Sequence, residues 1–534
     1  MTFSIIKRDG TIEKYKATKI GDAVCAAFAS IGEVCPTEAL KTLIADIEKE
    51  LEGIAENGSV RVEQIQDNVE IELMRAGFYR QARRFILYRE ERAKDRAYIN
   101  EIEQTVGIEG MHRLLKDVQR DYPHLCKSFG KLVSKYHAFH KPSMTAEEGL
   151  HALTRAAVEC ITAEEPDWEF VAGRLYSFQN DLNIRRKMEG LQLQSLYDKL
   201  SYLTTEGYYG AYILESYTKA EIDLAETFLQ VDRDRLLTYS GLDLLLRRYT
   251  VRNFVHEQLE TPQEMYLGIA LHLAMRETQN RMDHVRSFYD MLSKQQVSMA
   301  TPTLANARKP HHQMSSCFID TVDDSLEGIY RSIANFANVS KFGGGMGLYF
   351  GKVRANGSDI RGYKGAAGGV IRWIKLANDT AVAVDQLGVR SGAVACYLDV
   401  WHKDILDFLQ LRTNNGDDRM KAHDVFPAVC YPDLFWKKVR EGLDQSWYLM
   451  CPHEIQTIKG YALEDSYGDE WEQRYNDCVN DARITKTEVL LKDLIRLILK
   501  SAIETGTPFA FFRDHVNRMN PNKHTAAAIG PAIS

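Results

Sequence analysis

The stretch Lys341-Phe342-Gly343-Gly344-Gly345-Met346-Gly347-Leu348-Tyr349-Phe350 contains the densest glycine cluster in the chain. Apolar residues precede it with helical spacing, at Ile329, Ile333 and Phe336, and an apolar run typical of a strand follows it at 346–350. Glycines allow positive φ and close approach of the backbone, which phosphate-binding loops often require. Taken alone, the glycine cluster predicts a helix-to-strand connection and leaves packing and ligand binding as equal alternatives.

Short apolar runs alternate with helical segments in the whole region beyond residue 295. We expect strands at 296–299, 346–350, 394–400, 425–430, 447–450 and 508–512. Thr301-Pro302 is expected in a strand and turn at the start of this region. Alternating strands and helices predict an α/β layer or barrel.

The residues before this region show mainly helical patterns. A hairpin is expected over 3–15, and helical spacing follows at 20–31, at 65–73 after a cap at Ser59, and at 81–96. Amphipathic helices are expected at 181–202 and 236–249. The chain therefore divides into three expected domains, at 1–95, 96–290 and 291–534.

Composition excludes several classes of protein. The 534 residues are 45% hydrophobic and 26% charged, which is ordinary for a globular protein and unlike disordered or collagen-like chains. A net charge of -7 disfavours a nucleic-acid coat protein. No apolar run approaches the roughly 18 residues of a membrane span, and charges from Lys7 onward break any signal peptide, so we expect a cytoplasmic protein. The nine cysteines form no CxxC pair and are expected to be reduced.

Common nucleotide and catalytic motifs are not met. The glycine cluster lies in the order helix, loop, strand, whereas a dinucleotide fingerprint needs strand, GxGxxG, helix. The segment 357–364 approaches a P-loop but places Tyr363 between Gly362 and Lys364. Neither His311-His312 nor Cys451-Pro452-His453 has the further ligands of a zinc site, so no metal site is expected.

Three short segments remain as local candidates. Asp323-Asp324-Ser325 suits the start of a helix, where acidic and capping residues are favoured. Gly388-Val389-Arg390-Ser391-Gly392 is a loop that suits anion recognition. Cys317 follows Ser315-Ser316, and a lone cysteine is most often an inert buried thiol.

These features occur in an order that resembles the large (α) subunit of aerobic class I ribonucleotide reductase. The motifs that carry the resemblance are Lys7-Arg8-Asp9-Gly10, Thr162-Ala163-Glu164-Glu165-Pro166-Asp167, Tyr239-Ser240-Gly241-Leu242, Thr301-Pro302-Thr303-Leu304-Ala305-Asn306, Ser315-Ser316-Cys317, the glycine cluster, Arg354 and Gly388-Val389-Arg390. The resemblance runs from Ile5 to the last residues. It implies an α/β protein with an N-terminal ATP-cone, a helical domain and the first part of a ten-stranded α/β barrel.

The resemblance implies two allosteric nucleotide sites, each taking its nucleotide with Mg²⁺. An activity site for ATP or dATP in the cone is implied at Lys7, Arg8, Glu13, Lys19, Tyr88 and Arg89. A specificity site for dNTP effectors, at the interface of an α homodimer, is implied at Asp324, Lys341, Arg354, Ile360 and Arg361. There Lys341 and the glycine cluster would hold phosphates, and Asp324 would accept a hydrogen bond from a ribose hydroxyl. Gln386 and Arg390, in the loop 385–393, would relay the identity of the effector to the substrate.

The resemblance also implies the chemistry, which is reduction of ribonucleotides to deoxyribonucleotides by a ribonucleoside-diphosphate reductase. Substrate would bind at Thr301 and Ser316, and Cys317 would be a reducing thiol. Cys317 and a second cysteine would form a disulfide as the 2′-hydroxyl leaves as water. None of the later cysteines, Cys396, Cys430, Cys451 and Cys478, lies in the family's partner motif.

The sequence departs from the family pattern by lacking the Asn-Leu-Cys-x-Glu motif of the radical cysteine. We therefore expect the chain alone to be inactive and to act with a C-terminal α fragment or the remainder of a longer chain. A split gene, an intein or intron boundary and a truncated record are all open explanations. Further implied partners are a β subunit, which generates the radical with a metal cofactor, and thioredoxin or glutaredoxin. No nucleic-acid polymer or membrane partner is expected.

Two other functions stay open. The chain could be a non-catalytic nucleotide-binding regulatory module derived from the α subunit, although the presence of Ser316 and Cys317 favours a working half-site. A cobalamin-dependent relative would share the barrel and need no β subunit. The segment 239–253 resembles the β-dependent class more closely.

Overall fold

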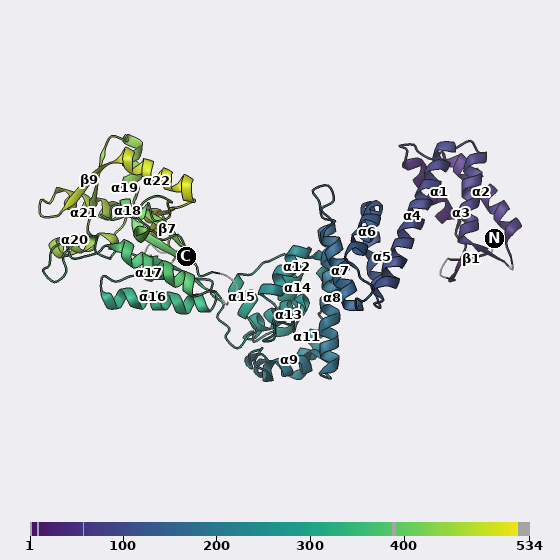
Figure 1. The fold of residues 1–534 in the computed structure, drawn as a ribbon, viewed down its shortest axis with the longest axis horizontal. Coiled ribbons are helices and arrows are strands. Elements are labelled where there is room, and N and C mark those ends of the chain that lie inside the picture. The colour runs from purple at the N-terminus through teal and green to yellow at the C-terminus, as the bar shows by residue number, and fades with distance from the viewer. Residues whose placement is uncertain (1–2, 8–9, 57, 387–390, 522–534) are drawn as a thin grey trace. The chain divides into compact units, whose positions relative to one another are not determined.

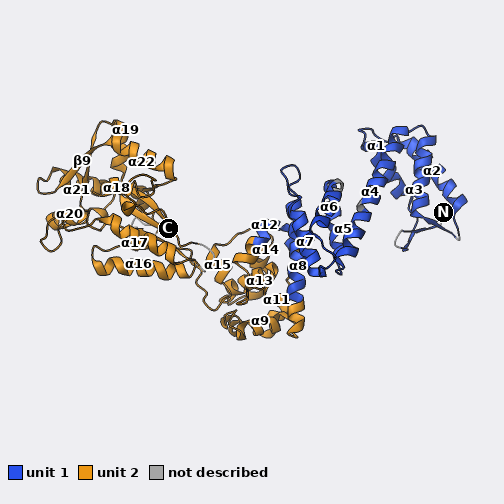
Figure 2. Cartoon of the chain, viewed as in Figure 1, with its two compact units in different colours: residues 1–185, 234–243 blue, residues 186–233, 244–534 orange. Residues whose placement is uncertain are grey.

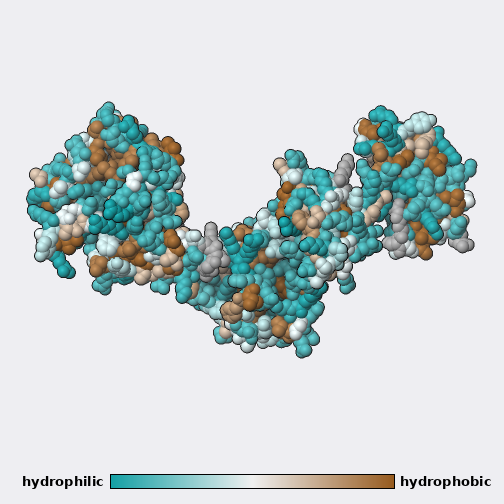
Figure 3. Space-filling model, viewed as in Figure 1, coloured by the Kyte–Doolittle hydropathy of each residue, from teal (hydrophilic) through white to brown (hydrophobic). Residues whose placement is uncertain are grey.

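The computed structural model describes residues 3–7, 10–56, 58–386 and 391–521 (Figure 1). The chain forms two compact units, of which unit 1 comprises 1–185 and 234–243, and unit 2 comprises 186–233 and 244–534 (Figure 2). The surface in view is mainly hydrophilic, with scattered apolar patches (Figure 3). Within the described residues, no helix is long and apolar enough to cross a membrane.

Unit 1 begins with a small three-stranded sheet and four helices. β1 (Ser4–Ile6) pairs antiparallel with β2 (Ile12–Lys14) and parallel with β3 (Ser59–Arg61). The helices are α1 (Ala17–Ala29), α2 (Thr37–Ile54), α3 (Val62–Arg75) and α4 (Tyr79–Val106). Apolar side chains at helical spacing on these elements form one core, whose most buried members include Val24, Ile47, Leu51 and Leu73.

The long helix α4 continues from this core into a second one. Its last turns contribute Ile99, Ile102 and Val106, which pack with α5 (Met111–Asp121), α6 (Phe129–Phe139), α7 (Ala146–Val158) and α8 (Trp168–Gly190). The apolar residues of α5 recur at spacings of four and three, at Met111, Leu115 and Val118, and all are buried. The opposite face of α5 is therefore left to its charged side chains.

Unit 2 has a helical part that leads to α15. Its helices are α9 (Leu196–Thr205), α10 (Tyr212–Ser216), α11 (Lys219–Glu226), α12 (Tyr239–Arg248, of which 244–248 belong to this unit), α13 (Pro262–Ala274), α14 (Arg281–Ser293) and α15 (Thr301–Asn306). The fully buried Arg308 anchors the end of α15, because its guanidinium donates to Glu260, to Leu304 O at 2.8 Å and to Tyr249 O at 2.8 Å. These bonds satisfy the buried charge.

A five-stranded parallel sheet forms the centre of the remaining residues. Its strand order is β10-β7-β6-β5-β4, with bounds β4 (Cys317–Thr321), β5 (Gly345–Tyr349), β6 (Val394–Asp399), β7 (Val425–Tyr431) and β10 (Phe509–Phe512). The helices α16 (Leu326–Lys341) and α17 (Val370–Ala383) lie side by side (Figure 1) and bury Ile329, Phe336 and Ile374 in the main core.

The other elements of unit 2 complete this core. β8 (Ser446–Met450) and β9 (Lys486–Leu490) form a separate antiparallel pair. The helices are α18 (Ile405–Phe408), α19 (Asp433–Glu441), α20 (Pro452–Lys459), α21 (Gly468–Asn480), α22 (Leu491–Thr505) and α23 (Arg513–Arg518).

Five of the six predicted strands beyond residue 295 are confirmed, from 346–350 to 508–512. The prediction at 296–299 was wrong, because these residues form an irregular connection. Thr301-Pro302 starts helix α15, since a proline at the first helical positions needs no N–H partner. The predicted helix 181–202 is interrupted between α8 and α9. Ser59, the expected cap, lies in β3, and α3 starts at Val62 directly after Arg61.

The strands β4 and β9 were not predicted. Both are short and carry polar residues, and β4 forms an edge of the sheet, so neither shows a continuous apolar run. The expected domain limits at 95 and 290 fall inside α4 and α14 and remain a prediction.

A buried ionic network holds the carboxyl end of the sheet. Asp399 at the end of β6 accepts from Tyr349 Oη at 2.5 Å and from Arg513 Nη1 at 2.6 Å, and Arg513 also donates to the carbonyl oxygen of Glu464. The Glu464 carboxyl is buried beside this network, and burial, together with the charge of Asp399, raises its pKa from 4.5 to about 7. Folding therefore favours the protonated form of Glu464.

We predict that Glu464→Gln removes a pH-dependent loss of stability. As pH rises from 4.5 to 7 the unfolded chain loses the Glu464 proton before the folded chain does, so the free energy of unfolding falls through this window and levels off above it. A shift of this size corresponds to about 3 kcal/mol. Urea unfolding followed by tryptophan fluorescence measures it, because five of the six tryptophans lie in unit 2.

The difference in free energy of unfolding between Glu464→Gln and wild type should rise by about 3 kcal/mol between about pH 4.5 and pH 8. The partly exposed Glu504 supplies the control, and Glu504→Gln should show a difference near zero across the same range. Parallel pH profiles for wild type and Glu464→Gln would contradict the prediction.

Candidate functional site

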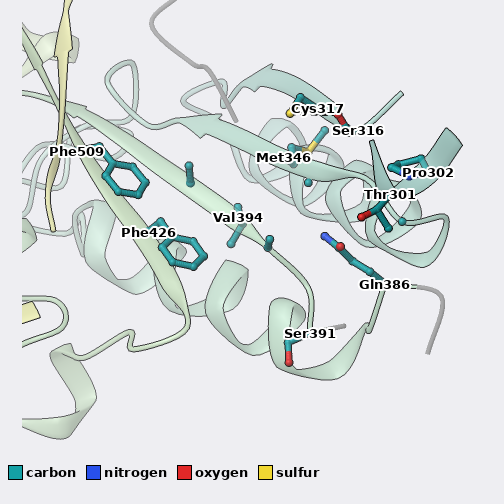
Figure 4. A pocket seen from close by; sticks show the side chains of 14 residues that line it. Thr301, Pro302, Ser316, Cys317, Met346, Gln386, Ser391, Val394, Phe426 and Phe509 are labelled. Carbon is teal, nitrogen blue, oxygen red and sulfur yellow. Dashed lines mark hydrogen bonds between the residues drawn. The ribbon is translucent and has the colours of Figure 1, made fainter. Parts of the chain in front are cut away.

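A cavity of about 490 Å³ lies at the amino ends of the parallel strands. In Figure 4, Phe426 and Phe509 lie to the left, and Thr301, Ser316 and Cys317 to the right. Cys317 is the first residue of β4, Phe509 is the first of β10 and Phe426 is the second of β7. Parallel pairing in register places these strand ends together, since Cys317 pairs with Gly345 and Met346 with Val394.

The predicted substrate residues are thus brought together in one cavity. Thr301 begins α15, and its hydroxyl lies 3.3 Å from Tyr249 Oη. Ser316 Oγ lies 3.7 Å from Cys317 Sγ. Cys317 is exposed, unlike the inert buried thiol that a lone cysteine most often is.

Of the two roles that the sequence left open for the glycine cluster, packing is confirmed at Gly344, and ligand binding stays a prediction. A side chain on Gly344 would meet Phe318 Cε2 at 2.9 Å and Val339 Cγ1 at 2.7 Å, so packing excludes one there. Gly343, with a φ of 88°, and Gly345 line the cavity. Gly345 N also donates to Ser316 O at 2.8 Å, which fixes the backbone beside Cys317.

Other cysteines of the sheet lie too far from Cys317 to form a disulfide with it. Cys396 lies on β6, two strands from β4. It pairs with Leu348 of β5, whereas Cys317 pairs with Gly345, three residues earlier on the same strand. Strand spacings of about 4.8 Å and a rise of about 3.3 Å per residue separate the two Cα atoms by about 14 Å. Disulfides need less than about 7 Å. Burial also raises the pKa of the Cys396 and Cys430 thiols far above its ordinary value.

The loop expected to relay effector identity borders the same cavity. Gln386 is buried, lines the cavity and donates to Gly344 O at 3.3 Å, and Ser391 lines the cavity from the other end of the loop. Arg390 lies outside the described residues, as do Gly388 and Val389. A side chain on Gly392 would meet Ala381 O at 2.7 Å, so Gly392 lies tightly against α17.

Four of the five predicted specificity residues lie in one region. Asp324 accepts from Arg354 N at 3.1 Å and from Arg354 Nε at 2.8 Å, and His453 Nδ1 lies 3.5 Å from it. Arg354 Nη1 donates to the carbonyl oxygen of Asp359, directly before Ile360 and Arg361. Arg354 thus binds both oxygens of Asp324, each of which can accept a further hydrogen bond, and the ribose contact expected for Asp324 stays a prediction.

Lys341 does not join this group. It ends α16, whereas Asp324 directly precedes the Ser325 cap of the same helix. Sixteen residues at about 1.5 Å each separate the two ends by about 24 Å. Within one chain, Lys341 therefore cannot hold the phosphates of a nucleotide whose ribose meets Asp324.

The predicted activity-site residues gather in unit 1. Glu13 binds Lys7 Nζ at 2.6 Å and Lys19 Nζ at 2.9 Å, and these bonds lower its pKa to about 2. Lys19, Tyr88 and Arg89 line a cavity of about 670 Å³. Arg89 also pairs with Asp67 at 2.5 Å and Glu70 at 2.8 Å. Arg8 lies outside the described residues.

Sequence reasoning missed several residues of these sites. Phe426 and Phe509 could have been found from the starts of their predicted strands, because parallel strands bring their amino ends to one edge. His453 beside Asp324 depends on long-range packing and has no local signal. Lys116 and Arg120, which line the unit 1 cavity from α5, were outside the segment considered for the activity site.

The fold and the sites define an α/β protein with an exposed thiol in one cavity and a second, cation-lined cavity in unit 1. Family models match in the same order: the ATP cone domain at residues 3–94, the ribonucleotide reductase all-alpha domain at 235–312 and the ribonucleotide reductase barrel domain at 315–530. The chain belongs to the family of ribonucleotide reductase large subunits. This confirms the resemblance seen in the sequence.

Curated relatives agree with this family. The chain is 57% identical over 524 residues to the ribonucleoside-diphosphate reductase subunit alpha of Treponema pallidum, covering 97% of this chain and 62% of that protein. It is 39% identical over 395 residues to the Helicobacter pylori protein of the same name (72% and 47%), and 34% identical over 562 residues to that of Chlamydia trachomatis (98% and 52%). The chain thus spans between about half and three fifths of these relatives' length.

We predict that Asp324→Ala loosens the segment around Arg354. The substitution removes the acceptor for both Arg354 bonds, and losing a partly buried charged hydrogen bond costs about 1.4 kcal/mol or more. Amide hydrogen exchange of residues 354–362 should then become about tenfold faster. The neighbouring Asp323 pairs with Arg331 at an exposed position, so Asp323→Ala should leave this exchange unchanged. Equal exchange in both variants would refute the assigned contact.

Proposed function

We propose that this chain forms the N-terminal part of a ribonucleoside-diphosphate reductase α subunit, which reduces ribonucleotides to deoxyribonucleotides. The observation that carries the proposal is the exposed thiol of Cys317 in a cavity that Thr301 and Ser316 also line. Membership of the large-subunit family supports the reaction class.

In this reaction Cys317 supplies one of two reducing thiols. The 2′-hydroxyl of the substrate leaves as water, the two thiols give up their hydrogens and form one disulfide, and the ribonucleotide becomes a deoxyribonucleotide. The second thiol comes from elsewhere in the complete α subunit, because the described cysteines of the sheet lie beyond disulfide reach. Thioredoxin or glutaredoxin restores the dithiol by thiol–disulfide exchange.

The polar groups of the cavity bind the substrate. Thr301 and Ser316 offer hydroxyls, and Gly343 and Gly345 allow close approach of the backbone to the sugar or phosphates. Phe426 and Phe509 are nearly parallel, with ring centroids 6.1 Å apart, and give the opposite wall an apolar surface. Such a wall excludes water from the reacting groups.

Effector nucleotides regulate this activity. The unit 1 cavity takes ATP or dATP, and its described lining holds six Lys and Arg side chains and no carboxylate, so Mg²⁺ would be held by the phosphates. The region of Asp324, Arg354, Ile360 and Arg361 takes dNTP effectors at an α homodimer interface, with Gln386 linking it to the substrate cavity.

The remaining partners complete the enzyme. A further α segment contributes the radical cysteine, and a β subunit generates the radical with its own metal cofactor. All eight cysteines described by the structure are free thiols, which suits the reducing cytoplasm that we propose as the location.

Cys317→Ser tests this proposal. In the reductase assembled from the complete α subunit and β, the variant should reduce CDP only at background rate, because serine cannot form the product disulfide. Binding of dATP and dTTP should stay at the wild-type level. Radiolabelled dCDP formation and equilibrium dialysis measure the two properties.

Cys25 gives a matched control, because it is a partly exposed free thiol of unit 1 and does not line the Cys317 cavity. Cys25→Ser should keep wild-type turnover. Wild-type dCDP formation by Cys317→Ser would exclude Cys317 as the reductant.

A further inference from the structure

The cavity of unit 1 has a lining suited to a polyanion with an apolar part. Its described lining contains six cationic side chains and no carboxylate; the cations are Lys16, Lys19, Arg89, Arg96, Lys116 and Arg120. Apolar and aromatic side chains, including Ile65, Val69 and Phe85, form the rest. Cations attract phosphates, and apolar and ring surfaces suit a purine base.

Two of these cations come from α5, which lies beyond residues 3–94 that match the cone. Lys116 and Arg120 are four residues apart, so they share one face of the helix. Burial of Met111, Leu115 and Val118 sets the rotation of α5, and this rotation directs the cationic face toward the cavity.

Lys116 and Arg120 of α5 differ in their ion-pair partners. Arg120 pairs with Asp117 at 2.7 Å and Asp121 at 3.0 Å, and the same carboxylates bind Arg235 and Arg174. Lys116 is exposed and has no ion-pair partner among the residues that the structure describes. A ligand phosphate would supply that partner.

Gln119 gives an independent sign of a missing ligand. It lies between Lys116 and Arg120 in sequence and lines the same cavity. Its side-chain nitrogen is buried and has no hydrogen-bond partner in the described structure. An unsatisfied buried donor costs free energy, which a ligand oxygen can restore.

We propose that a nucleoside triphosphate in this cavity is bound jointly by the cone and by α5, with Lys116 and Arg120 pairing with its distal phosphates. This inference rests on the proposed activity site and extends it beyond the cone. Lys19 and Arg89 hold the nucleotide from α1 and α4, and α5 closes the site from the helical part of unit 1. Because Arg120 already pairs with Asp117 and Asp121, a bound phosphate competes with these two carboxylates for Arg120 and leaves them to Arg235 and Arg174.

The test is a hydrogen-exchange titration of the full chain with dATP and dAMP. Protection of the segments 62–75 and 79–91, which contribute Val62, Phe85 and other residues to the cavity lining, reports occupancy of this site. The double variant Lys116→Ala and Arg120→Ala should raise the dATP concentration for half-protection about tenfold or more. The dAMP midpoint should change less than about twofold, because dAMP lacks the distal phosphates.

Arg113→Ala is the control, since it removes a positive charge from an exposed position of the same helix that does not line the cavity. Arg113→Ala should leave the dATP and dAMP concentrations for half-protection unchanged. The charge-conserving variant Lys116→Arg should keep most of the wild-type affinity for dATP. An equal loss for dATP and dAMP would mean that the variant only disturbs the fold, and would overturn the proposal.

Two further outcomes separate this inference from the proposed activity site. Normal dATP protection in both the wild type and the double variant would overturn the role of α5 and leave the cone site standing. Absence of protection by either nucleotide in the wild type would overturn both.

Discussion

The pairing of Cys317 with Gly345 is the constraint on which the Cys317 cavity depends. Side chains alternate between the faces of a strand, so a slip of one residue in β4 would turn Cys317 to the other face. Phe318, the next residue of β4, packs in the space that the missing side chain of Gly344 leaves, and a slip of β4 would move Phe318 out of it. Register and the absence of a side chain therefore act together to present the thiol.

The two ends of the parallel sheet differ in chemistry: the carboxyl end holds a buried ion pair, and the amino end lines a cavity. At the carboxyl end, Asp399 and Arg513 are both buried and bind each other, which joins β6 to the residue after β10. Removing one partner of such a pair leaves an unpaired buried charge, which costs about 3–5 kcal/mol. The amino end keeps its hydroxyls, glycines and thiol available to a ligand. In open α/β sheets ligands usually bind at the carboxyl ends, whereas the candidate site of this chain lies at the amino ends.

The sequence allowed the interior strands and the longer helices to be predicted, because burial on both faces or one face produces clear apolar patterns. It did not reveal β4, an edge strand with Asp320 and Thr321, or the start of α15 at Thr301, where proline was taken for a turn. Thr301, Ser316, Cys317 and Gln386 were assigned through a family resemblance, and the structure places them in one cavity. Lys341 was assigned through the same resemblance and lies at the opposite end of α16 from Asp324, so its place in an effector site at a subunit interface stays a prediction. Contacts such as His453 with Asp324 join residues far apart in the chain and had no local signature.

The most direct test of the central claim is alkylation of the native chain by iodoacetamide, with each cysteine followed by mass spectrometry. Cys317 should react much faster than the buried Cys396 and Cys430, and a ribonucleoside diphosphate with its effector should slow that reaction at Cys317 alone. Alkylation of Cys317 at the same rate with and without nucleotides would contradict its place in a substrate site.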